Sequence, residues 1–334
     1  QGEIVISSRI RLARNLAGYN FVNHAGRTQR AEILSRCREQ VLSADLADQV
    51  LWIDLAESPE TDRQLLVERQ LISRQHALEG PDRPRAVAID PDETFAIMIN
   101  EEDHVRISVL RSGLQLDTAF DQIDAIDDAL ESRLDWAYSS RWGYMTACPT
   151  NVGTGIRMSV MMHLPALKLT GEIDKVRRAA RDLHLAVRGL FGEGSEAYGD
   201  LYQLSNQTTL GRGEQEILQD FKQHIVPQVI AYEQQAREAL VQHRGRQLDD
   251  KIWRAWAVLT HARVISAEEV LTCLSHLRMG VNLGRIDTVD IRTINELFLL
   301  TQPAHLHVLT GCEMEQNARR EARADLIRQR LGAS

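Results

Sequence analysis

The sequence changes character at about Gly213, and this change limits the folds that are open to it. Before that point, short segments alternate apolar and polar residues, as strands with one buried face do, and helical patterns lie between them. After it, the patterns are helical. We therefore predict an α+β fold, with a mixed domain over residues 1–235 and an all-helical domain over residues 236–334.

Residue patterns also predict the individual elements. The expected strands are residues 5–11, 86–89, 94–99, 105–109, 156–164 and 183–188. The expected helices are residues 31–43, 120–137, 214–243, 288–300 and 315–331, a helix capped by Thr61, and one that opens at the capping box 266–269. No internal repeat interrupts this order.

Five arginines lie on the polar faces of the expected strands: Arg9, Arg11, Arg106, Arg157 and Arg188. Side chains two residues apart share one face of a strand, so Arg9 and Arg11 point the same way while Ile10 points into the core. If these strands belong to one antiparallel sheet, its open face becomes a cationic surface. Each arginine taken alone could equally be an ordinary exposed strand residue.

A cationic sheet surface suits the phosphates of ATP. The planar guanidinium of arginine binds phosphate oxygens in pairs and does not lose its charge. The chain has neither a Walker A glycine–lysine loop nor a kinase-type glycine-rich loop. A nucleotide site in this chain would therefore have to be built from arginines.

Residues 100–106, Asn-Glu-Glu-Asp-His-Val-Arg, directly follow the apolar run 95–99. Dense charge at the end of a strand is costly unless the charges face water or a ligand. We therefore expect this stretch to border a binding site, together with the arginine-bearing strands.

Two further segments carry candidate chemistry. Residues 148–155 place Cys148 before a turn rich in Asn, Gly and Thr, and nearby arginines would favour its thiolate, although a lone cysteine is often buried and inert. Residues 188–196 surround Glu193 with three glycines. This second pattern describes either a mobile loop that carries an acid or a plain glycine-rich hairpin.

The bulk properties exclude several classes of partner. A net charge of −8 argues against a general nucleic-acid or membrane-surface binder, because those partners need a positive field. No apolar run approaches the roughly 18 residues that span a bilayer, and no signal-peptide pattern opens the chain. Four widely spaced cysteines suit a reduced, cytoplasmic protein. Because the chain starts with Gln1, we expect a trimmed or processed N-terminus.

The motifs at residues 7–11, 100–104, 148–157 and 188–193 occur in the order found in the phosphagen (guanidino) kinase family, and the chain resembles that family over nearly its whole length. Residues 143–148, 159–167, 192–197 and 299–303 most resemble its bacterial protein arginine kinase branch. The resemblance implies a catalytic domain built on an antiparallel β-sheet flanked by helices. It also implies transfer of the γ-phosphoryl group of MgATP to arginine residues in proteins.

The resemblance implies roles for individual residues. The nucleotide-binding residues would be Ser7, Ser8, Arg9, Ile10, Arg11, Arg106, Arg157, Met158, Ser159, Val160, Met161, Arg188, Gly189, Leu190, Phe191 and Gly192. Glu102 would bind the substrate guanidinium and accept its proton, Glu193 would clamp it, and Cys148 would orient it as a thiolate. Mg²⁺ would be held mainly by nucleotide phosphates and water, with no metal site on the protein.

Two positions depart from the pattern of that branch. Gln70 stands where a histidine that contacts adenine is common, with His76 nearby, so the adenine contacts stay unassigned. A phosphoarginine pocket with the pattern Arg-Asp-x-x-Arg-Ala is matched here by Arg319 and Arg323, but Arg320 replaces the aspartate and would repel a guanidinium. The alternative interpretation of this basic segment is a solvated helix face.

The branch forms dimers, so the helical domain is expected to serve dimerisation or regulation. The resemblance further implies an activator protein and a Clp unfoldase as partners, in a stress response that marks proteins for degradation or regulates repressors. Members that act on small guanidino compounds have a helical domain before the first arginine motif and a histidine at the position of Met161, so we expect a protein-borne acceptor. Two alternatives are a kinase for free arginine or another small guanidine, and an inactive adaptor that binds phosphoarginine.

Overall fold

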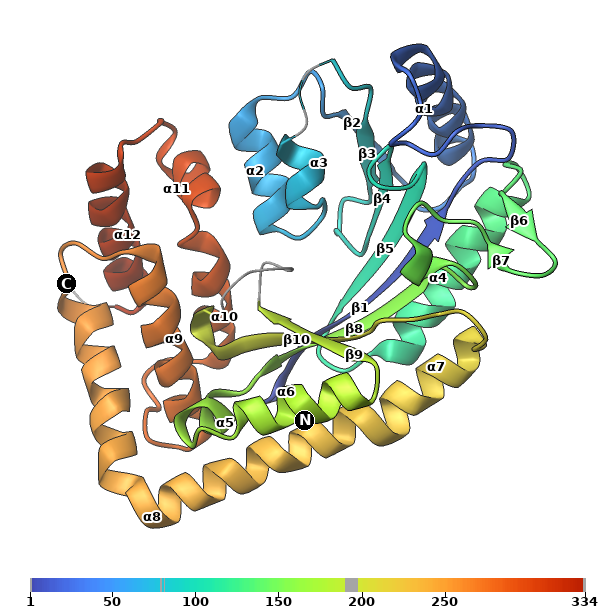
Figure 1. The fold of residues 1–334 in the computed structure, drawn as a ribbon. Helices are drawn as coiled ribbons and strands as arrows, with labels where there is room; N and C mark the ends of the chain where they lie inside the picture. The colour runs from blue at the N-terminus through green and yellow to red at the C-terminus, as the bar shows by residue number, and fades with distance from the viewer. Residues whose placement is uncertain (1, 79, 81, 190–197, 333–334) are drawn as a thin grey trace.

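The computed structural model describes residues 2–78, 80, 82–189 and 198–332 (Figure 1). Within them, eight strands form one sheet in the order β2-β3-β4-β5-β1-β8-β10-β9, and all neighbours run antiparallel. The strands are β1 Val5–Arg14, β2 Leu51–Asp54, β3 Ala86–Ile89, β4 Phe95–Ile99, β5 Val105–Ser112, β8 Ile156–His163, β9 Leu185–Gly189 and β10 Leu201–Asn206. A small hairpin joins β6 Tyr138–Ser139 to β7 Gly143–Tyr144. The prediction of an antiparallel sheet is confirmed.

Helices cover the sheet and continue beyond it. They are α1 Arg27–Leu42, α2 Glu60–Glu68, α3 Arg74–Leu78, α4 Leu116–Glu131, α5 Pro165–Leu169, α6 Ile173–Asp182, α7 Glu214–Asp220, α8 Val226–His261, α9 Ala267–Asn282, α10 Ile291–Leu300, α11 Pro303–Thr310 and α12 Gln316–Arg330. The fully buried Ile10, Ile107 and Val160 belong to the same core as residues of α1, α4, α6, α7 and α8. A second, smaller core lies between β3, β4 and the helices α2 and α3.

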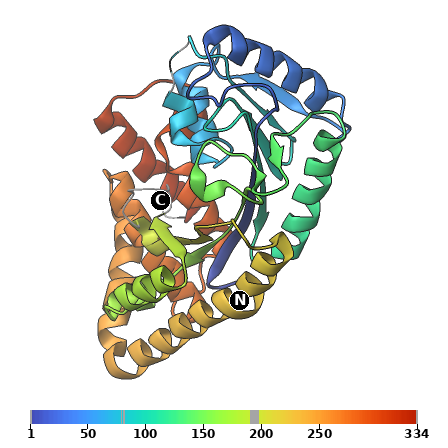
Figure 2. The ribbon, with the colours of Figure 1, turned by 45° about the vertical axis from the view of Figure 1, so that its right-hand side comes forward.

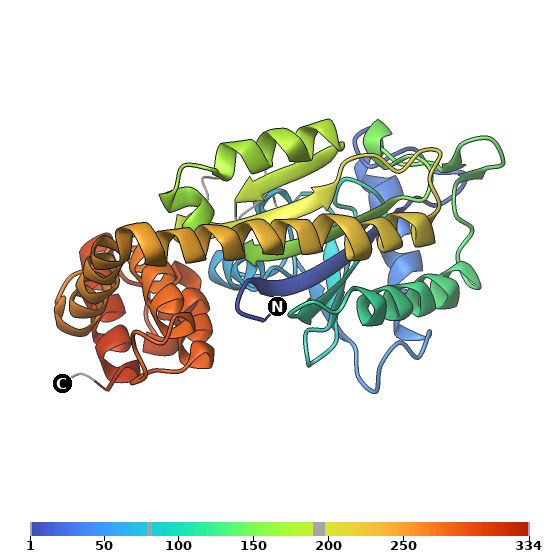
Figure 3. The ribbon, with the colours of Figure 1, turned by 90° about the horizontal axis from the view of Figure 1, so that it is seen from below.

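Helix α8 connects the sheet to the C-terminal helices (Figure 3). It crosses the predicted boundary between residues 235 and 236, and its backbone leaves helical geometry at Arg244, where φ is −136° and ψ is 29°. Helices α9 and α12 pack against α8, α10 packs on α9, and α11 lies between α12 and α2 (Figure 2). The buried apolar core runs without interruption from the sheet through α8 into α9 and α10. The division into two domains therefore stays a prediction.

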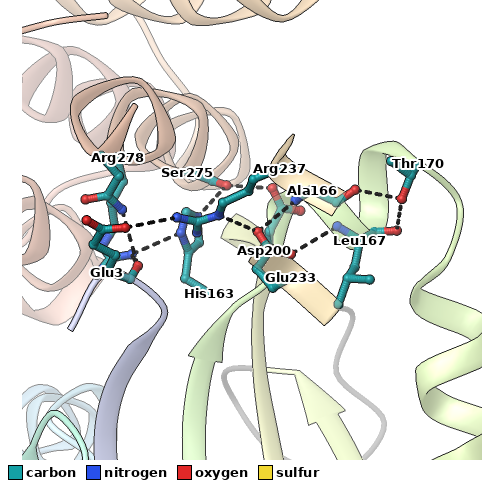
Figure 4. Close-up of polar contacts among 11 residues, drawn as sticks. Glu3, His163, Ala166, Leu167, Thr170, Asp200, Glu233, Arg237, Ser275 and Arg278 are labelled. Carbon is teal, nitrogen blue, oxygen red and sulfur yellow. Dashed lines mark hydrogen bonds and ion pairs between the residues drawn. The ribbon is translucent and has the colours of Figure 1, made fainter. Parts of the chain in front are cut away.

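A buried polar network also ties the sheet to helix α9 (Figure 4). Arg278 Nη1 donates to the carbonyl oxygen of Glu3 at 2.6 Å and to His163 Nδ1 at 3.0 Å. His163 Nε2 lies 2.9 Å from Ser275 Oγ, which donates to Asp200 at 2.5 Å. Because arginine can only donate, His163 accepts at Nδ1 and carries its proton on Nε2. Burial and the charge of Arg278 lower the pKa of His163 well below its usual value, so this histidine is neutral.

Several expected helix boundaries are wrong, and one expected cap is confirmed. The helix expected over residues 214–243 continues through α7 and α8 to His261. Thr61 does not cap its helix, because α2 begins at Glu60 after Pro59. The helix expected to reach residue 137 ends at Glu131. Ser266 does cap α9, where its side chain accepts a hydrogen bond from the Glu269 N–H at 3.1 Å. Among the described residues, no helix is both long and apolar enough to cross a membrane.

Candidate active site

The five predicted arginines project from the same face of the sheet. Arg11 pairs directly with Arg157 of β8, and Arg9 pairs with Ser159 two residues further along. Arg106 of β5 pairs with Ala13 of β1. Arg188 of β9 is linked through Gln203 and Met161 to Ser7 of β1. Directly paired residues share a face, so strands β5, β1, β8 and β9 together form one arginine face.

The guanidinium groups of this face crowd one another. Burial lowers the pKa of Arg11 well below its usual value, and the charges of Arg9, Arg106, Arg157 and Arg188 lower it further. Burial and the charge of Arg106 also lower the pKa of Arg9 to about 10. Within the described part of the chain, the buried Nε of Arg11 has no hydrogen-bond partner. Crowded, partly desolvated cations with an unused donor fit a polyanion such as a triphosphate.

The acidic stretch that follows β4 is largely buried, contrary to the expectation that its charges face water or a ligand. Asn100, Glu101, Asp103 and His104 are at most 6% exposed. Glu101 accepts hydrogen bonds from Ser73 Oγ at 2.6 Å and from the Arg106 guanidinium. Although burial opposes ionisation, Arg106 and these hydrogen bonds hold the pKa of Glu101 at about 2. Most of this stretch is therefore part of the protein's own framework.

Glu102 differs from its buried neighbours. Its side chain is 38% exposed, and its Oε2 lies 3.3 Å from Arg106 Nη2. Burial and the neighbouring carboxylates of Asp103 and Glu101 raise the pKa of Glu102, although the charge of Arg106 opposes them. A raised carboxyl pKa makes Glu102 a stronger base near neutral pH, at the edge of the arginine face.

Asp103 joins the Glu102 turn to the Cys148 segment. Its Oδ1 accepts hydrogen bonds from Asn15 Nδ2 and from the Ala147 N–H, both at 2.7 Å. The turn that carries Glu102 and the segment that carries Cys148 are thereby fixed against each other. Cys148 is partly exposed, and its Sγ lies 3.1 Å from a threonine hydroxyl, Thr150 Oγ1.

We expect Asp103→Ala to reduce the catalytic rate by about 10- to 100-fold, because it removes the acceptor shared by the buried Asn15 amide and the partly buried Ala147 N–H, and losing such an acceptor costs roughly 1–3 kcal/mol. Asp103→Asn keeps an acceptor oxygen and should retain most of the activity. Initial rates for the two variants, with circular dichroism as a check on folding, measure this difference. Equal rates for Asp103→Ala and the unmodified protein would show that the link does not position the site.

The other residues predicted to bind the nucleotide fall into three groups. Ile10, Met158 and Val160 point into the core, so only their backbone is on the site. Ser8 is also buried, and its hydroxyl donates to the carbonyl oxygen of Gly113 at 2.8 Å. Ser7, Ser159 and Met161 lie on the arginine face, while Gly189 ends β9. Leu190, Phe191, Gly192 and Glu193 lie outside the described residues.

The predicted phosphoarginine pocket lies on α12. Arg323 is buried, and it donates to the carbonyl oxygens of Thr301 at 2.8 Å and Ile265 at 3.2 Å. Burial lowers the pKa of Arg323, and the nearby charges of Arg319 and Arg320 lower it further. Arg323 thus holds α12 against its neighbours, while Arg319 and Arg320 are half-buried beside it.

Sequence reasoning gave no role to several residues that organise the site. Glu101 and Asp103 stood in the same motif as Glu102, but nothing in the motif separates a buried carboxylate from an exposed one. Asn15 and Ser73 complete the network from segments far away in the chain. His76 is no candidate for an adenine contact, because it is fully buried and bonded to the Ala86 carbonyl oxygen. In the described ranges, no group of three or more His, Cys, Asp or Glu side chains is placed to hold a metal ion.

Comparison with known proteins defines the class. The family model "ATP:guanido phosphotransferase, C-terminal catalytic domain" matches residues 32–236, more than half of the chain. The crystal structure of lombricine kinase is 27% identical, with a TM-score of 0.59 over 70% of this chain and 67% of that one. The duplicated taurocyamine kinase from Schistosoma mansoni is 25% identical, with a TM-score of 0.58 over 69% of this chain and 33% of that one. This chain therefore spans about a third of the duplicated protein. The fold and the sequence together define an ATP:guanidino phosphotransferase.

More similar relatives narrow the assignment. The protein-arginine kinase of Halothermothrix orenii is 45% identical over 98% of this chain and 93% of its own length. That of Symbiobacterium thermophilum is 46% identical over 99% of this chain and 94% of its own length. A second family model, the protein-arginine kinase McsB C-terminal domain, matches residues 245–334. The chain belongs to the protein-arginine kinase family.

Proposed function

We propose that this protein transfers the γ-phosphoryl group of ATP to the guanidinium of arginine residues in other proteins. The observation that carries the proposal is the arginine face, which places Glu102 beside Arg106 at its edge. Relatives named protein-arginine kinase along the whole chain support the choice of acceptor. The four widely spaced cysteines, all of them free, support a location in the reducing cytoplasm.

In the proposed mechanism, Arg9, Arg11, Arg106, Arg157 and Arg188 hold the phosphates and spread the charge that develops on the transferred group. The bond between the γ-phosphorus and the bridging oxygen breaks, a bond from phosphorus to a guanidinium nitrogen forms, and ADP leaves. Glu102 takes the proton that the nitrogen loses. A free guanidinium has a pKa above about 12, so proton loss must accompany attack on phosphorus.

Three further groups complete the proposal. Cys148 orients the guanidinium from the segment that Asp103 fixes. Glu193 clamps the guanidinium from its glycine-rich segment. The described residues fit a magnesium ion that would be held mainly by nucleotide phosphates and water, because Glu101 is already engaged by Arg106 and Ser73. When bound, Mg²⁺ neutralises part of the phosphate charge.

Incubation with MgATP and an unfolded, arginine-rich protein tests the function. We expect acid-labile phosphate on arginine residues, detected by mass spectrometry under non-acidic conditions. A strong preference for free arginine over the protein would favour a small-guanidine kinase instead. The absence of ATP turnover with any guanidino acceptor would favour the inactive adaptor.

We also propose that the helical region 236–334 forms a homodimer. Val308 and Leu309, neighbours near the end of α11, are each more than half exposed, which supports an apolar contact between copies. We further propose two partners, an activator protein and a Clp unfoldase. We also propose that the protein acts in a stress response. Arg319 and Arg323 are the proposed phosphoarginine-binding residues, although Arg323 already holds two carbonyl oxygens.

A further inference from the structure

The hairpin formed by β6 and β7 leaves large apolar side chains in solvent. Residues 138–144 have the sequence Tyr-Ser-Ser-Arg-Trp-Gly-Tyr, and Figure 1 shows them projecting beyond the sheet. Tyr138 is 63% exposed and Trp142 is 43% exposed. The guanidinium of Arg141 lies over the Trp142 ring, 4.5 Å from its centroid. Exposed apolar surface of this kind is typical of interaction sites.

The hairpin is also composed of residue types that recognise other proteins. Tyr and Trp supply large, rigid contact area at a low cost in conformational entropy, while Ser and Gly supply adaptable hydrogen bonds. Trp, Tyr and Arg are the residues that most often dominate the binding energy of an interface. Every position of residues 138–144 is one of these types. Such a surface suits a partner whose sequence varies.

Backbone contacts fix the hairpin against the Cys148 segment. The Tyr144 N–H donates to the Gly153 carbonyl oxygen at 2.7 Å, and the Gly153 N–H donates back to Tyr144 at 3.3 Å. Residues 144–153 therefore form a closed loop with Cys148 near its middle. Gly143, at a φ of 77°, lies so close to the Gly153 backbone that a Cβ would not fit between them.

A third exposed side chain joins the hairpin from a distant segment. Leu210 is 51% exposed. A Cβ on Gly153 would lie 3.1 Å from Leu210 Cα, so Gly153 touches the Leu210 segment as well as the hairpin. Thr209 Oγ1 adds a hydrogen bond to the Val152 carbonyl oxygen at 2.9 Å. We call the three exposed side chains the apolar platform: Tyr138, Trp142 and Leu210.

The apolar platform is continuous with the proposed acceptor site. Asp103 directly follows Glu102, and its Oδ1 accepts a hydrogen bond from the Ala147 N–H at 2.7 Å. Asn15 Nδ2 donates to Asp103 Oδ1 at 2.7 Å and to the carbonyl oxygen of Met145, the residue after the hairpin, at 3.1 Å. An extended chain covers about 3.3 Å per residue. Residues a few positions from an acceptor arginine must therefore lie on the surface around this site.

The charge beside the platform suits a cationic chain. The ring of Tyr144 packs edge-on against Tyr138, with 5.3 Å between centroids, and its hydroxyl donates to Glu131 Oε1 at 3.3 Å. Burial raises the pKa of Tyr144 to about 12, although the charge of Arg14 opposes this, so the hydroxyl keeps its proton at neutral pH. Glu131 is exposed, and its carboxylate favours a segment that carries arginine.

We propose that the apolar platform binds apolar or aromatic side chains that lie a few residues from the acceptor arginine in the substrate protein. The inference rests on the proposed function, since a free guanidino compound has no such neighbours. Folded proteins bury most of their large apolar side chains, whereas an unfolded chain exposes them. The platform therefore selects arginines in unfolded segments that also contain apolar residues.

Two synthetic peptides that share a single acceptor arginine test the platform. Leucine and phenylalanine flank the arginine in the apolar peptide, and serine and asparagine take their places in the polar peptide. We expect the unmodified protein to show the lower KM for the apolar peptide. Trp142→Ala should raise that KM about 10-fold, the scale of one lost interface tryptophan, and bring the kcat/KM values of the two peptides together.

Two further variants complete the kinetic test. Leu210→Ser should change the peptide preference in the same direction, because the contacts of Gly153 with Leu210 involve its backbone and not its side chain. Trp253→Ala is the matched control, since Trp253 is a tryptophan of α8 that is 52% exposed, and the preference should stay unchanged. Equal kcat/KM for both peptides with the unmodified protein would overturn the inference. An equal loss for both peptides in Trp142→Ala would also overturn it, because the hairpin would then only support the Cys148 segment.

Binding without nucleotide gives a readout that does not depend on catalysis. Fluorescence anisotropy of the labelled apolar peptide should show affinity about 10-fold weaker for Trp142→Ala than for the unmodified protein and Trp253→Ala. Equal or undetectable affinity in all three proteins would overturn the platform. Binding through Trp142 with no phosphorylated arginine would contradict the proposed function alone. Phosphorylation of both peptides that does not depend on Trp142 would contradict the platform alone.

Discussion

Replacing Glu102 by glutamine is expected to slow arginine phosphorylation by about 10²- to 10⁴-fold, the usual contribution of a positioned general base. Glutamine keeps the shape of the side chain but can neither take the proton nor carry the charge that pairs with a guanidinium. The fold should be unaffected, because Arg106 keeps its ion pair with the buried Glu101. Initial rates with an unfolded, arginine-rich protein measure the loss.

Nucleotide binding separates this effect from a general disturbance of the site. MgATP affinity should change little in the Glu102→Gln protein, because the arginines that hold the phosphates are intact. Glu216→Gln is the matched control, since Glu216 of α7 is an exposed carboxylate whose Oε1 lies 2.9 Å from Arg212 Nε. Full activity of Glu102→Gln would contradict the role of Glu102 as the base.

The largest loss of stability is expected from Asp127→Ala. Asp127 accepts from Arg14 Nε at 3.1 Å and from Arg14 Nη2 at 2.5 Å, and both side chains are buried. Removing the carboxylate leaves a buried guanidinium without its partner, which costs about 3–5 kcal/mol. Urea unfolding measures the change in the free energy of unfolding. Asp135→Ala, which removes a carboxylate that is 89% exposed and 3.7 Å from Arg36, should change it by less than about 0.5 kcal/mol.

The Asp127→Ala deficit should depend on pH through Glu214, which lies 4.0 Å from Arg14. Burial raises the pKa of Glu214 to about 7, despite the opposing charge of Arg14. In the unmodified protein, the neutral form of Glu214 stabilises the fold in acid. This stabilisation is lost as pH rises through 7, because Glu214 ionises at a lower pH in the unfolded chain than in the folded protein. In the variant, the ionised Glu214 takes the place of Asp127 beside Arg14, so ionisation costs less. The deficit should therefore be smaller at pH 8 than at pH 6, and an equal deficit at both would rule out this replacement.

The arginine face could be predicted from the sequence because it depends on strand alternation alone. Ile10 between Arg9 and Arg11 fixes the direction of three side chains once β1 is a strand, and Arg106 and Arg157 follow the same rule in β5 and β8. The family motifs supplied the order of these strands along the chain. Neither signal needs any knowledge of contacts between distant segments.

The supporting residues could not be predicted, because their roles depend on such contacts. Asp103 meets Ala147 and Asn15 only after three segments have assembled, and a motif of consecutive acids does not say which of them will be buried. Residues of α10 line one cavity with Ser7, which lies near the other end of the chain. Strand β10 is short, and its alternation is weak, so its place between β8 and β9 was not expected either.

Helix α8 has a consequence for how the molecule unfolds. Its 36 residues would extend about 54 Å as a regular helix, and they bury side chains at both ends, from Val226 beside the sheet to Leu259 beside the C-terminal helices. Within the described residues, α8 itself joins the sheet to the C-terminal helices, so melting either end of this helix removes support from the other. The sheet and the C-terminal helices should therefore unfold together, as a single cooperative unit. Calorimetry should show one transition, because each half is less stable without the other.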